Sequence, residues 1–177
     1  MVVFKVLKVD NLKNILNEHI LLHCSNKYKG EKLKESLFAY ETLFLLYKEK
    51  TGKDLIGVYY DSDGRPKSKD LTLTLSHSHG VVGVGFSLKN GDNIAIDVEK
   101  VGSVRKPLKK LLNLNDTCSK EDFYIEWTKK ECFKKALNLS LIKNEEKEFL
   151  GVSKIIEIDG EAYALSVYCE GDYEINI

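Results

Sequence analysis

Alternating apolar and polar residues predict three strands in the middle of the chain. In LTLTLS, residues 71–76, the leucines are expected to face a core, and the hydroxyl-bearing residues between them are expected to face outward. The next strands are expected in VVGVGFSL at 81–88 and in IAIDVEKV at 94–101. Asn90-Gly91 between them is a strong hairpin signal. We therefore expect these three strands to form an antiparallel meander.

Apolar residues at helical spacing predict two long helices. One follows the basic stretch KYKGEKLK and runs to about Lys50, because Gly52 stops it. The other spans residues 119–137, where Ser119 followed by Asp122 is a weaker form of the capping box.

The remaining elements alternate in a way that is typical of mixed folds. They are strands over 2–9, 152–158, 162–169 and 173–177 and shorter helices over 12–22 and 104–112. The order of strand, helices and strands, followed by a helix and strands, predicts an α+β fold with two similar halves. In each half a small antiparallel sheet is expected to pack with a long helix.

Composition limits the classes of function. The 177 residues carry 27 Lys plus Arg and 27 Asp plus Glu, so no global charge excess favours nucleic acid, and any polyanion must bind a local patch. Four cysteines without CxxC spacing favour reduced thiols in a cytoplasmic protein over a zinc site or a disulfide framework. Charges interrupt the apolar N-terminus, and no apolar run reaches membrane-spanning length.

Two carboxylates interrupt the apolar strand IAIDVEKV. Because side chains alternate across a strand, Ile94, Ile96 and Val98 can face a core while Asp97 and Glu99 share the other face. Like charges that close repel each other, and a hard cation such as Mg²⁺ would join them. The alternative is a strand that runs into solvent with its acids hydrated.

Three further stretches carry candidate chemistry and each has a plain structural interpretation. In WTKKECFKKA, Glu131 and Lys135 lie on one helix face, either as a solvated ion pair or as a metal ligand or base beside a phosphate-binding ammonium. In SHSHG, Ser76 and His77 are either surface residues or hydrogen-bond partners of a phosphate. Arg65 in GRP belongs either to a simple turn or to an anion site.

The order and spacing of these motifs resemble those of a known family. GRP at 64–66, SHS at 76–78, IAIDVE at 94–99 and WTKKECFKK at 127–135 are similar to G-[KR]-P, S-H-S, (I/V)-G-(I/V)-D-(I/V)-E and W-[ST]-x-K-E-[SAC]-x-x-K. These motifs, in this order, mark the 4′-phosphopantetheinyl transferases of the surfactin-synthetase-activating type. The likeness spans about residues 64–141, somewhat under half of the chain.

The resemblance implies an activity and a site. The family moves 4′-phosphopantetheine from coenzyme A to a serine of an apo acyl or peptidyl carrier protein and releases 3′,5′-adenosine diphosphate. By this likeness, Asp97, Glu99 and Glu131 would bind Mg²⁺ with the pyrophosphate of coenzyme A, and Glu131 would also serve as the base. The expected coenzyme contacts are Arg65, Ser76, His77, Lys130 and Lys135, with Lys135 also part of the catalytic group.

The likeness also implies an organisation and partners. It divides the chain into an N-terminal half, 1–93, with coenzyme contacts and a C-terminal half, 94–177, with the metal site and the catalytic helix. It implies a monomer, and the composition predicts a cytoplasmic protein that binds neither nucleic acid nor membrane. The basic segment 104–112 is expected to dock the carrier protein or to be a solvated amphipathic helix.

Two departures from the family pattern stand out. Ala95 replaces a glycine, and Asn138-Leu139-Ser140-Leu141 stands where G-x-G-L is common. Three other functions remain open: a coenzyme A-binding homologue without transfer activity, a carboxylate-metal phosphohydrolase that acts on nucleotides, and a non-enzymatic interaction domain.

Overall fold

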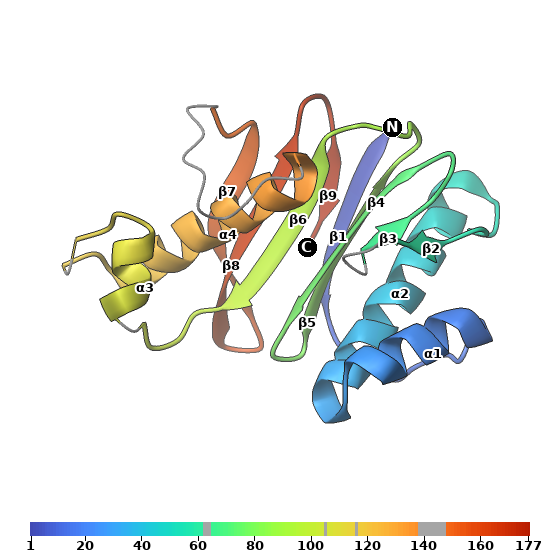
Figure 1. The fold of residues 1–177 in the computed structure, drawn as a ribbon, viewed down its shortest axis with the longest axis horizontal. Coiled ribbons are helices and arrows are strands. Elements are labelled where there is room, and N and C mark those ends of the chain that lie inside the picture. Colours follow the sequence, from blue (N-terminus) through green and yellow to red (C-terminus); the bar gives the residue numbers. More distant parts are fainter. Residues whose placement is uncertain (62–64, 105, 116, 138–147) are drawn as a thin grey trace.

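The computed structural model describes residues 1–61, 65–104, 106–115, 117–137 and 148–177 (Figure 1). The helices are α1 (Glu18–Lys27), α2 (Gly30–Thr51), α3 (Lys106–Leu111) and α4 (Lys120–Leu137). The strands are β1 (Val2–Lys8), β2 (Tyr59–Tyr60), β3 (Pro66–Lys67), β4 (Thr72–Ser78), β5 (Val81–Ser87), β6 (Ile94–Lys100), β7 (Gly151–Ile158), β8 (Glu161–Cys169) and β9 (Glu174–Asn176). The fold is therefore α+β, as the sequence predicts.

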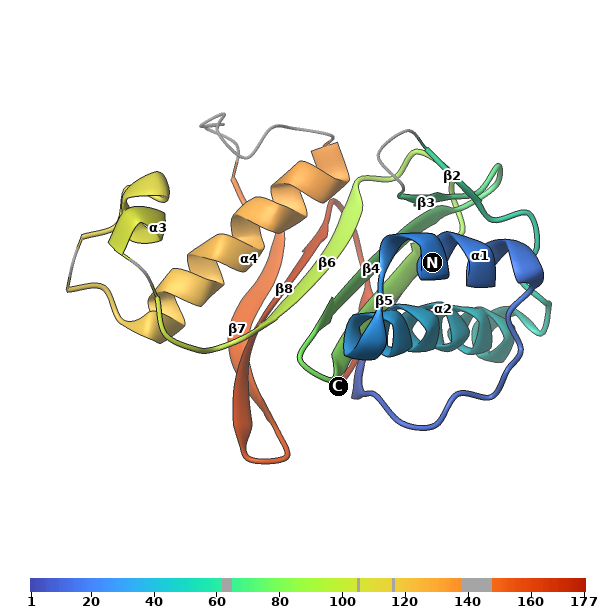
Figure 2. The same ribbon diagram turned by 60° about the horizontal axis from the view of Figure 1, so that its bottom comes forward.

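The first sheet has four strands in the order β4-β5-β1-β9. Its hairpin β4–β5 turns at His79 and Gly80, which both have positive φ, as a two-residue turn of this hand requires. Helix α2 packs on one face of this sheet, with α1 beside it (Figure 2). Since β9 runs parallel to β1, this sheet is mixed rather than purely antiparallel.

The second sheet has three antiparallel strands in the order β6-β8-β7, and α4 packs across it (Figures 1 and 2). The chain passes from the first sheet to the second between β5 and β6 and returns to the first with β9. The two halves are therefore linked by the crossing chain and by an exchanged C-terminal strand.

The expected three-stranded meander is wrong. Strand β6 pairs with β8 rather than with β5, so Asn90-Gly91 turns the chain between two sheets instead of closing a hairpin. The physical reason is that β8, far along the chain, offers β6 a full ladder of backbone partners from Ile94↔Cys169 to Lys100↔Tyr163.

The outward placement of the hydroxyl-bearing residues of β4 is also wrong. Thr74, Ser76 and Ser78 are buried, because they face the edge of β6. We call this contact between β4 and β6 the seam. It joins the edge strands of the two sheets through side chains instead of a backbone ladder.

The two sheets also share an apolar core. One buried cluster combines Val2, Phe4, Val6 and Val81 of the first sheet with residues of β6, β7 and β8. Gly83 on β5 makes room for this packing, since a Cβ there would lie 2.9 Å from Cδ1 of Ile96. The two halves therefore share a core.

The two long helices agree with the sequence prediction. Helix α2 ends at Thr51 with Gly52 in the left-handed conformation, and at the start of α4 the Ser119 hydroxyl accepts the Asp122 N–H and donates to its carboxylate. The first short helix is displaced: α1 begins at Glu18, where the Asn17 side chain accepts the Ile20 N–H, instead of near residue 12. The segment before it is held by long-range contacts described below.

Two further observations concern the chain as a whole. Of the helices among the residues that the structure describes, none is long and apolar enough to cross a membrane. All four cysteines are free thiols.

Candidate functional site

The two faces of β6 differ in the way that the sequence predicts. Ile94, Ile96 and Val98 enter the shared core, whereas Ala95 packs beneath α4 with Cys132. Asp97 therefore lies between the second sheet and α4, next to the seam, and is only 3% exposed. This burial rules out the interpretation of Asp97 as a hydrated surface acid.

Asp97 is held from both halves of the molecule. Its Oδ1 atom accepts a hydrogen bond of 2.8 Å from the Ser76 hydroxyl of β4 and one of 2.6 Å from the Lys135 ammonium of α4. Its Oδ2 atom is buried and has no hydrogen-bond partner among the described residues. A buried carboxylate oxygen without a partner is costly, so this oxygen is the candidate ligand atom of the site.

Lys135 lies near the end of α4 and binds three oxygens around the seam. Besides Asp97, its ammonium donates to the carbonyls of Ile96 at 3.1 Å and Leu75 at 3.4 Å. Burial, the largest single influence, would lower the pKa of Lys135, but the charge and hydrogen bond of Asp97 act together with Cys132 and the charge of Glu131, and the pKa is raised. Lys135 is therefore a permanent cation at the seam, with a quarter of its side chain exposed.

Glu99 lies two residues further along the same face of β6. Its Oε2 atom accepts a 2.8 Å hydrogen bond from the Ser78 hydroxyl. Burial raises the pKa of Glu99, and the nearby charges of Asp97 and Glu131 act in the same direction, whereas Ser78 and Lys135 oppose the shift. The three predicted metal ligands thus lie close enough to influence one another electrostatically.

Glu131 comes from α4 and is mostly buried, at 17% side-chain exposure, with Lys134 as an ion-pair partner at 3.7 Å. Among the described ranges of the chain, no three His, Cys, Asp or Glu side chains are grouped so that they could hold a metal ion. The carboxylates of Asp97, Glu99 and Glu131 are therefore neighbours, but they are not arranged as a finished three-ligand cluster.

His77 faces the other side of β4, away from the carboxylates. Its Nδ1–H donates to Glu35 Oε2 at 3.0 Å, and Tyr28 packs edge-on against the ring. Burial lowers the pKa of His77 from its ordinary value of 6.5, although Glu35 opposes this shift. A neutral imidazole that donates to Glu35 through Nδ1 leaves Nε2 as an acceptor.

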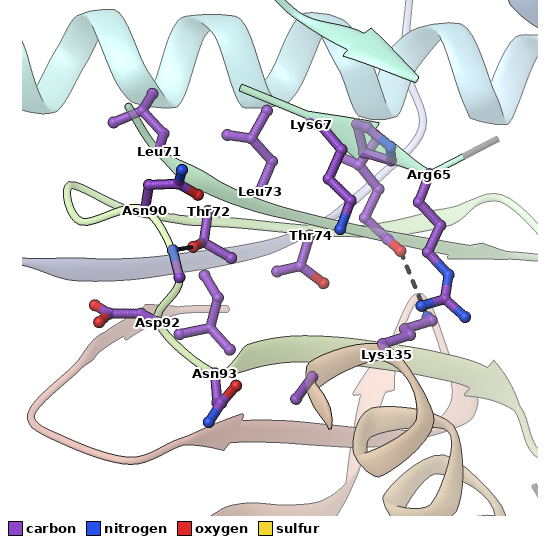
Figure 3. Close-up of a pocket in the computed structure, with 15 residues that line it drawn as sticks. Arg65, Lys67, Leu71, Thr72, Leu73, Thr74, Asn90, Asp92, Asn93 and Lys135 are labelled. Atoms are coloured by element: carbon purple, nitrogen blue, oxygen red, sulfur yellow. Dashed lines mark hydrogen bonds between the residues drawn. The ribbon is translucent and has the colours of Figure 1, made fainter. Parts of the chain in front are cut away.

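A cleft of about 290 Å³ opens between the halves beside Lys135. It is lined by β3, β4, the loop before β6 and the end of α4. Figure 3 shows Arg65, Lys67 and Lys135 at one end of the cleft and Asn90, Asp92 and Asn93 at the other. The cationic end is the end that adjoins Asp97.

A second cavity, of about 150 Å³, lies inside the N-terminal half and is lined by α1, α2, β3 and β4. It shares Arg65, Pro66 and Leu75 with the first, and His77 and Lys27 also line it. The two cavities therefore adjoin at Arg65. Together they form a local basic region on a chain of zero formal net charge.

Two other buried carboxylates provide a reference for Asp97. Glu41 is 2% exposed, and its two oxygens accept the backbone N–H groups of Lys13 and Ile15 at 2.7 and 3.2 Å. Glu35 is 6% exposed, and its oxygens accept the Gly80 N–H and the His77 ring N–H. Each oxygen of these two carboxylates has a hydrogen-bond partner, whereas Oδ2 of Asp97 has none in the part of the chain that the structure describes.

The structure brings together only part of the predicted site. Ser76, Asp97, Glu99 and Lys135 gather at the seam with Glu131 nearby, while Arg65 and His77 line the adjoining cavities. Lys130 lies on another face of α4, because five residues along a helix place it about 140° around the axis from Lys135. Gly64 of the GRP turn and residues 138–141 lie outside the described residues.

The predicted docking segment corresponds to α3, which lies beyond the N-terminal end of α4 in Figure 1. Of its cations, Lys109 hydrogen bonds to the carbonyl of Cys118, Lys110 is exposed, and Arg105 lies outside the described residues. Lys109 therefore has a structural partner in addition to any role at the surface.

Sequence reasoning missed Ser78 and Glu35 as partners of site residues. Ser78 continues the alternation of hydroxyl groups along β4, and this alternation is a signal that predicts Ser78 on the same face as Ser76. Glu35 lies within a helical stretch with no signal that links it to His77.

Comparison with known proteins gives no family: no family model matches this chain, and no curated protein matches it.

Proposed function

We propose that the protein transfers 4′-phosphopantetheine from coenzyme A to a serine of an apo acyl or peptidyl carrier protein. The observation that carries this proposal is the buried Oδ2 of Asp97, which has no partner among the described residues and lies beside a cationic cleft. Metal-assisted phosphoryl chemistry needs a carboxylate with free coordination capacity next to cations that bind phosphate. The ordered motifs around this carboxylate supply the choice of reaction.

The residues at the seam fit a divalent cation. Mg²⁺ takes oxygen ligands and is commonly held by one or two carboxylates together with substrate phosphates. Asp97 offers an oxygen that has no partner within the described ranges, and Glu99 and Glu131 would contribute carboxylates nearby. When bound, the ion would neutralise charge on the pyrophosphate.

The cations of the cleft fit the substrate. Coenzyme A carries a pyrophosphate and a 3′-phosphate, which are bound best by charge-assisted hydrogen bonds. Lys135 and Arg65 lie where the two cavities and the seam meet, and neutral His77 offers Nε2 as a hydrogen-bond acceptor. Arg65 and Lys135 would thus bind phosphate groups, whereas Nε2 of His77 would accept from a hydroxyl or amino group of the nucleotide. Lys130 remains a further predicted contact, and the hydrogen of Ser76, which goes to Asp97, is not free for a phosphate.

The transfer is a displacement at phosphorus. The carrier serine oxygen forms a bond to the phosphorus that bears pantetheine, and the bond from that phosphorus to the bridging pyrophosphate oxygen breaks. The leaving group is 3′,5′-adenosine diphosphate. A serine hydroxyl needs a base, and Glu131, directly or through a water molecule, would take its proton. Lys135 would offset the negative charge that the leaving phosphate gains.

The proposal extends to partners and location. The carrier protein would approach the seam from the side of α3 and α4, where Lys109 and Lys110 present basic side chains. The enzyme would act as a monomer in the cytoplasm and bind neither nucleic acid nor membrane.

The experiment is to incubate the protein with coenzyme A, Mg²⁺ and apo carrier proteins of fatty acid, polyketide and peptide synthesis and to weigh the products. We expect one phosphopantetheine added to a carrier, together with one equivalent of 3′,5′-adenosine diphosphate. A parallel reaction without carrier separates the alternatives, because a phosphohydrolase would consume coenzyme A there and a transferase would not. Binding of coenzyme A without transfer to any carrier would favour the inactive homologue.

A further inference from the structure

We propose that Ser76 and Ser78 are positioning residues, whose hydroxyl groups each fix one carboxylate of the site across the seam. This inference deepens the proposed function, because it assigns residues of β4 to the orientation of Asp97 and Glu99. It also gives Ser76 a role different from direct contact with a phosphate.

The seam repeats one hydrogen-bond pattern three times. Along β4, the side-chain oxygens of Thr74, Ser76 and Ser78 accept backbone N–H groups of β6. The donors are Ile96, Val98 and Lys100, at 3.1, 3.2 and 3.2 Å respectively. Each hydroxyl therefore replaces the backbone carbonyl that a neighbouring strand would normally offer.

The same hydroxyls have a second partner at two of the three positions. Ser76 donates to Asp97 and Ser78 donates to Glu99, both at 2.8 Å. In each case the carboxylate belongs to the residue just before the one whose N–H the hydroxyl accepts. At the third position that residue is Ala95, which has no carboxylate.

The geometry of a hydroxyl group explains the consequence. A serine hydroxyl has one hydrogen to donate and two lone pairs that accept. When a lone pair is fixed by the backbone of β6, the hydrogen is directed by that bond, and it points to the adjacent carboxylate. Ser78 also contacts Nδ1 of His79 at 3.1 Å, which restrains its oxygen further.

The orientation matters for a metal. Partners that hydrogen bond to ligating groups orient them, and their loss typically weakens metal affinity by about 10- to 100-fold. With Ser76 on Oδ1 of Asp97, the oxygen left for a ligand is Oδ2, for which the described residues supply no partner. Ser78 fixes Oε2 of Glu99 in the same way, at 2.8 Å, and so orients the whole carboxylate.

The seam supplies a matched control. Thr74→Val, Ser76→Ala and Ser78→Ala each remove one acceptor of a β6 backbone N–H, but only the serine variants remove a carboxylate contact. We expect the three to lose similar free energy of unfolding in chelator. By calorimetry without coenzyme A or carrier, the Mg²⁺ dissociation constant should rise about tenfold for each serine variant and stay unchanged for Thr74→Val. Ser78→Thr should keep the wild-type dissociation constant, because it retains the hydroxyl group and Thr74 shows that threonine fits the seam.

A metal-free readout separates this inference from the proposed function. In chelator, the side-chain ¹³C carboxyl signal of Glu99 should shift in Ser78→Ala and keep its position in Thr74→Val. If the wild type binds Mg²⁺ but the serine variants bind it as well as Thr74→Val does, the positioning role is wrong. If the wild type binds no Mg²⁺, the metal site fails, and an unshifted Glu99 signal in Ser78→Ala would overturn the positioning role as well.

Discussion

Asp97 and Glu41 are both almost fully buried carboxylates, but they are used in opposite ways. Both oxygens of Glu41 accept backbone N–H groups, and these hydrogen bonds fix the segment before α1. Asp97 receives Ser76 and Lys135 on a single oxygen and leaves the other without a partner among the described residues. Burial alone therefore does not mark a functional acid. The feature that distinguishes Asp97 is a carboxylate oxygen that has no partner among the described residues and lies beside a cationic cleft.

The largest effect is expected from a substitution of Asp97, which removes the oxygen that distinguishes it from Glu41. Asp97→Asn keeps an acceptor for Ser76 and Lys135 but removes the charge and the free carboxylate oxygen. We expect the rate of phosphopantetheine transfer to fall by about 100-fold or more, since charge stabilisation at the reacting centre is lost. The fold should persist by circular dichroism. A transfer rate close to that of the wild type would contradict the role of Asp97.

Glu41→Gln sharpens the comparison from the other side. The amide can accept only one of the two backbone N–H groups and presents its own N–H to the other. We expect a loss of about 1–3 kcal/mol in the free energy of unfolding, measured by urea denaturation. Transfer by the folded variant should be unchanged. A selective loss of activity without a loss of stability would show that Glu41 is more than structural.

The ammonium beside Asp97 can be tested separately. Lys135→Gln keeps a hydrogen-bond donor for Asp97 and removes the positive charge, so 3′,5′-adenosine diphosphate should bind about tenfold more weakly by calorimetry. Lys129→Gln is the control on the same helix, because Lys129 pairs with Glu126 at 2.7 Å. Equal weakening in both variants would mean a general charge effect instead of a specific contact.

The smallest expected effect concerns His77, which pairs with the fully used carboxylate of Glu35. Because burial lowers the pKa of His77 below 6.5, the unfolded chain binds the proton more readily between the lowered pKa and 6.5. The contribution of His77 to stability is therefore present above pH 6.5 and is lost as the pH falls through this window.

His77→Asn should remove that contribution. Urea denaturation over a pH series should then show a weaker fall in the free energy of unfolding below pH 6.5 than in the wild type. An identical pH dependence in the two proteins would mean that the pKa of His77 does not differ between the folded and unfolded states.

Local patterns predicted the elements that local forces determine. The capping residues Ser119 and Asp122 and the stop at Gly52 set the ends of the long helices, and each could be identified from neighbours in the sequence. The start of α1 could not be predicted in this way. Apolar residues from Leu12 onward predict a helix, but hydrogen bonds to the distant Glu41 hold that segment in another conformation. The helix begins only after the Asn17 cap.

The candidate site was predictable on one strand and not across the seam. Alternation along β6 correctly separated Ile96 from Asp97. The partner of β6 is β8, which follows it by a long stretch of chain, so no local pattern could reveal that β6 leaves β5. Because that pairing was missed, Ser78 was not recognised as a neighbour of Glu99.

The most direct test of the central claim is coenzyme A binding measured by calorimetry with and without Mg²⁺. The unused oxygen of Asp97 predicts that wild-type protein binds coenzyme A more tightly with Mg²⁺ than in chelator, and that Asp97→Asn loses this difference while Glu41→Gln retains it. Binding by the wild type that is equally tight in Mg²⁺ and in chelator, or a Mg²⁺ dependence that survives in Asp97→Asn, would contradict the account.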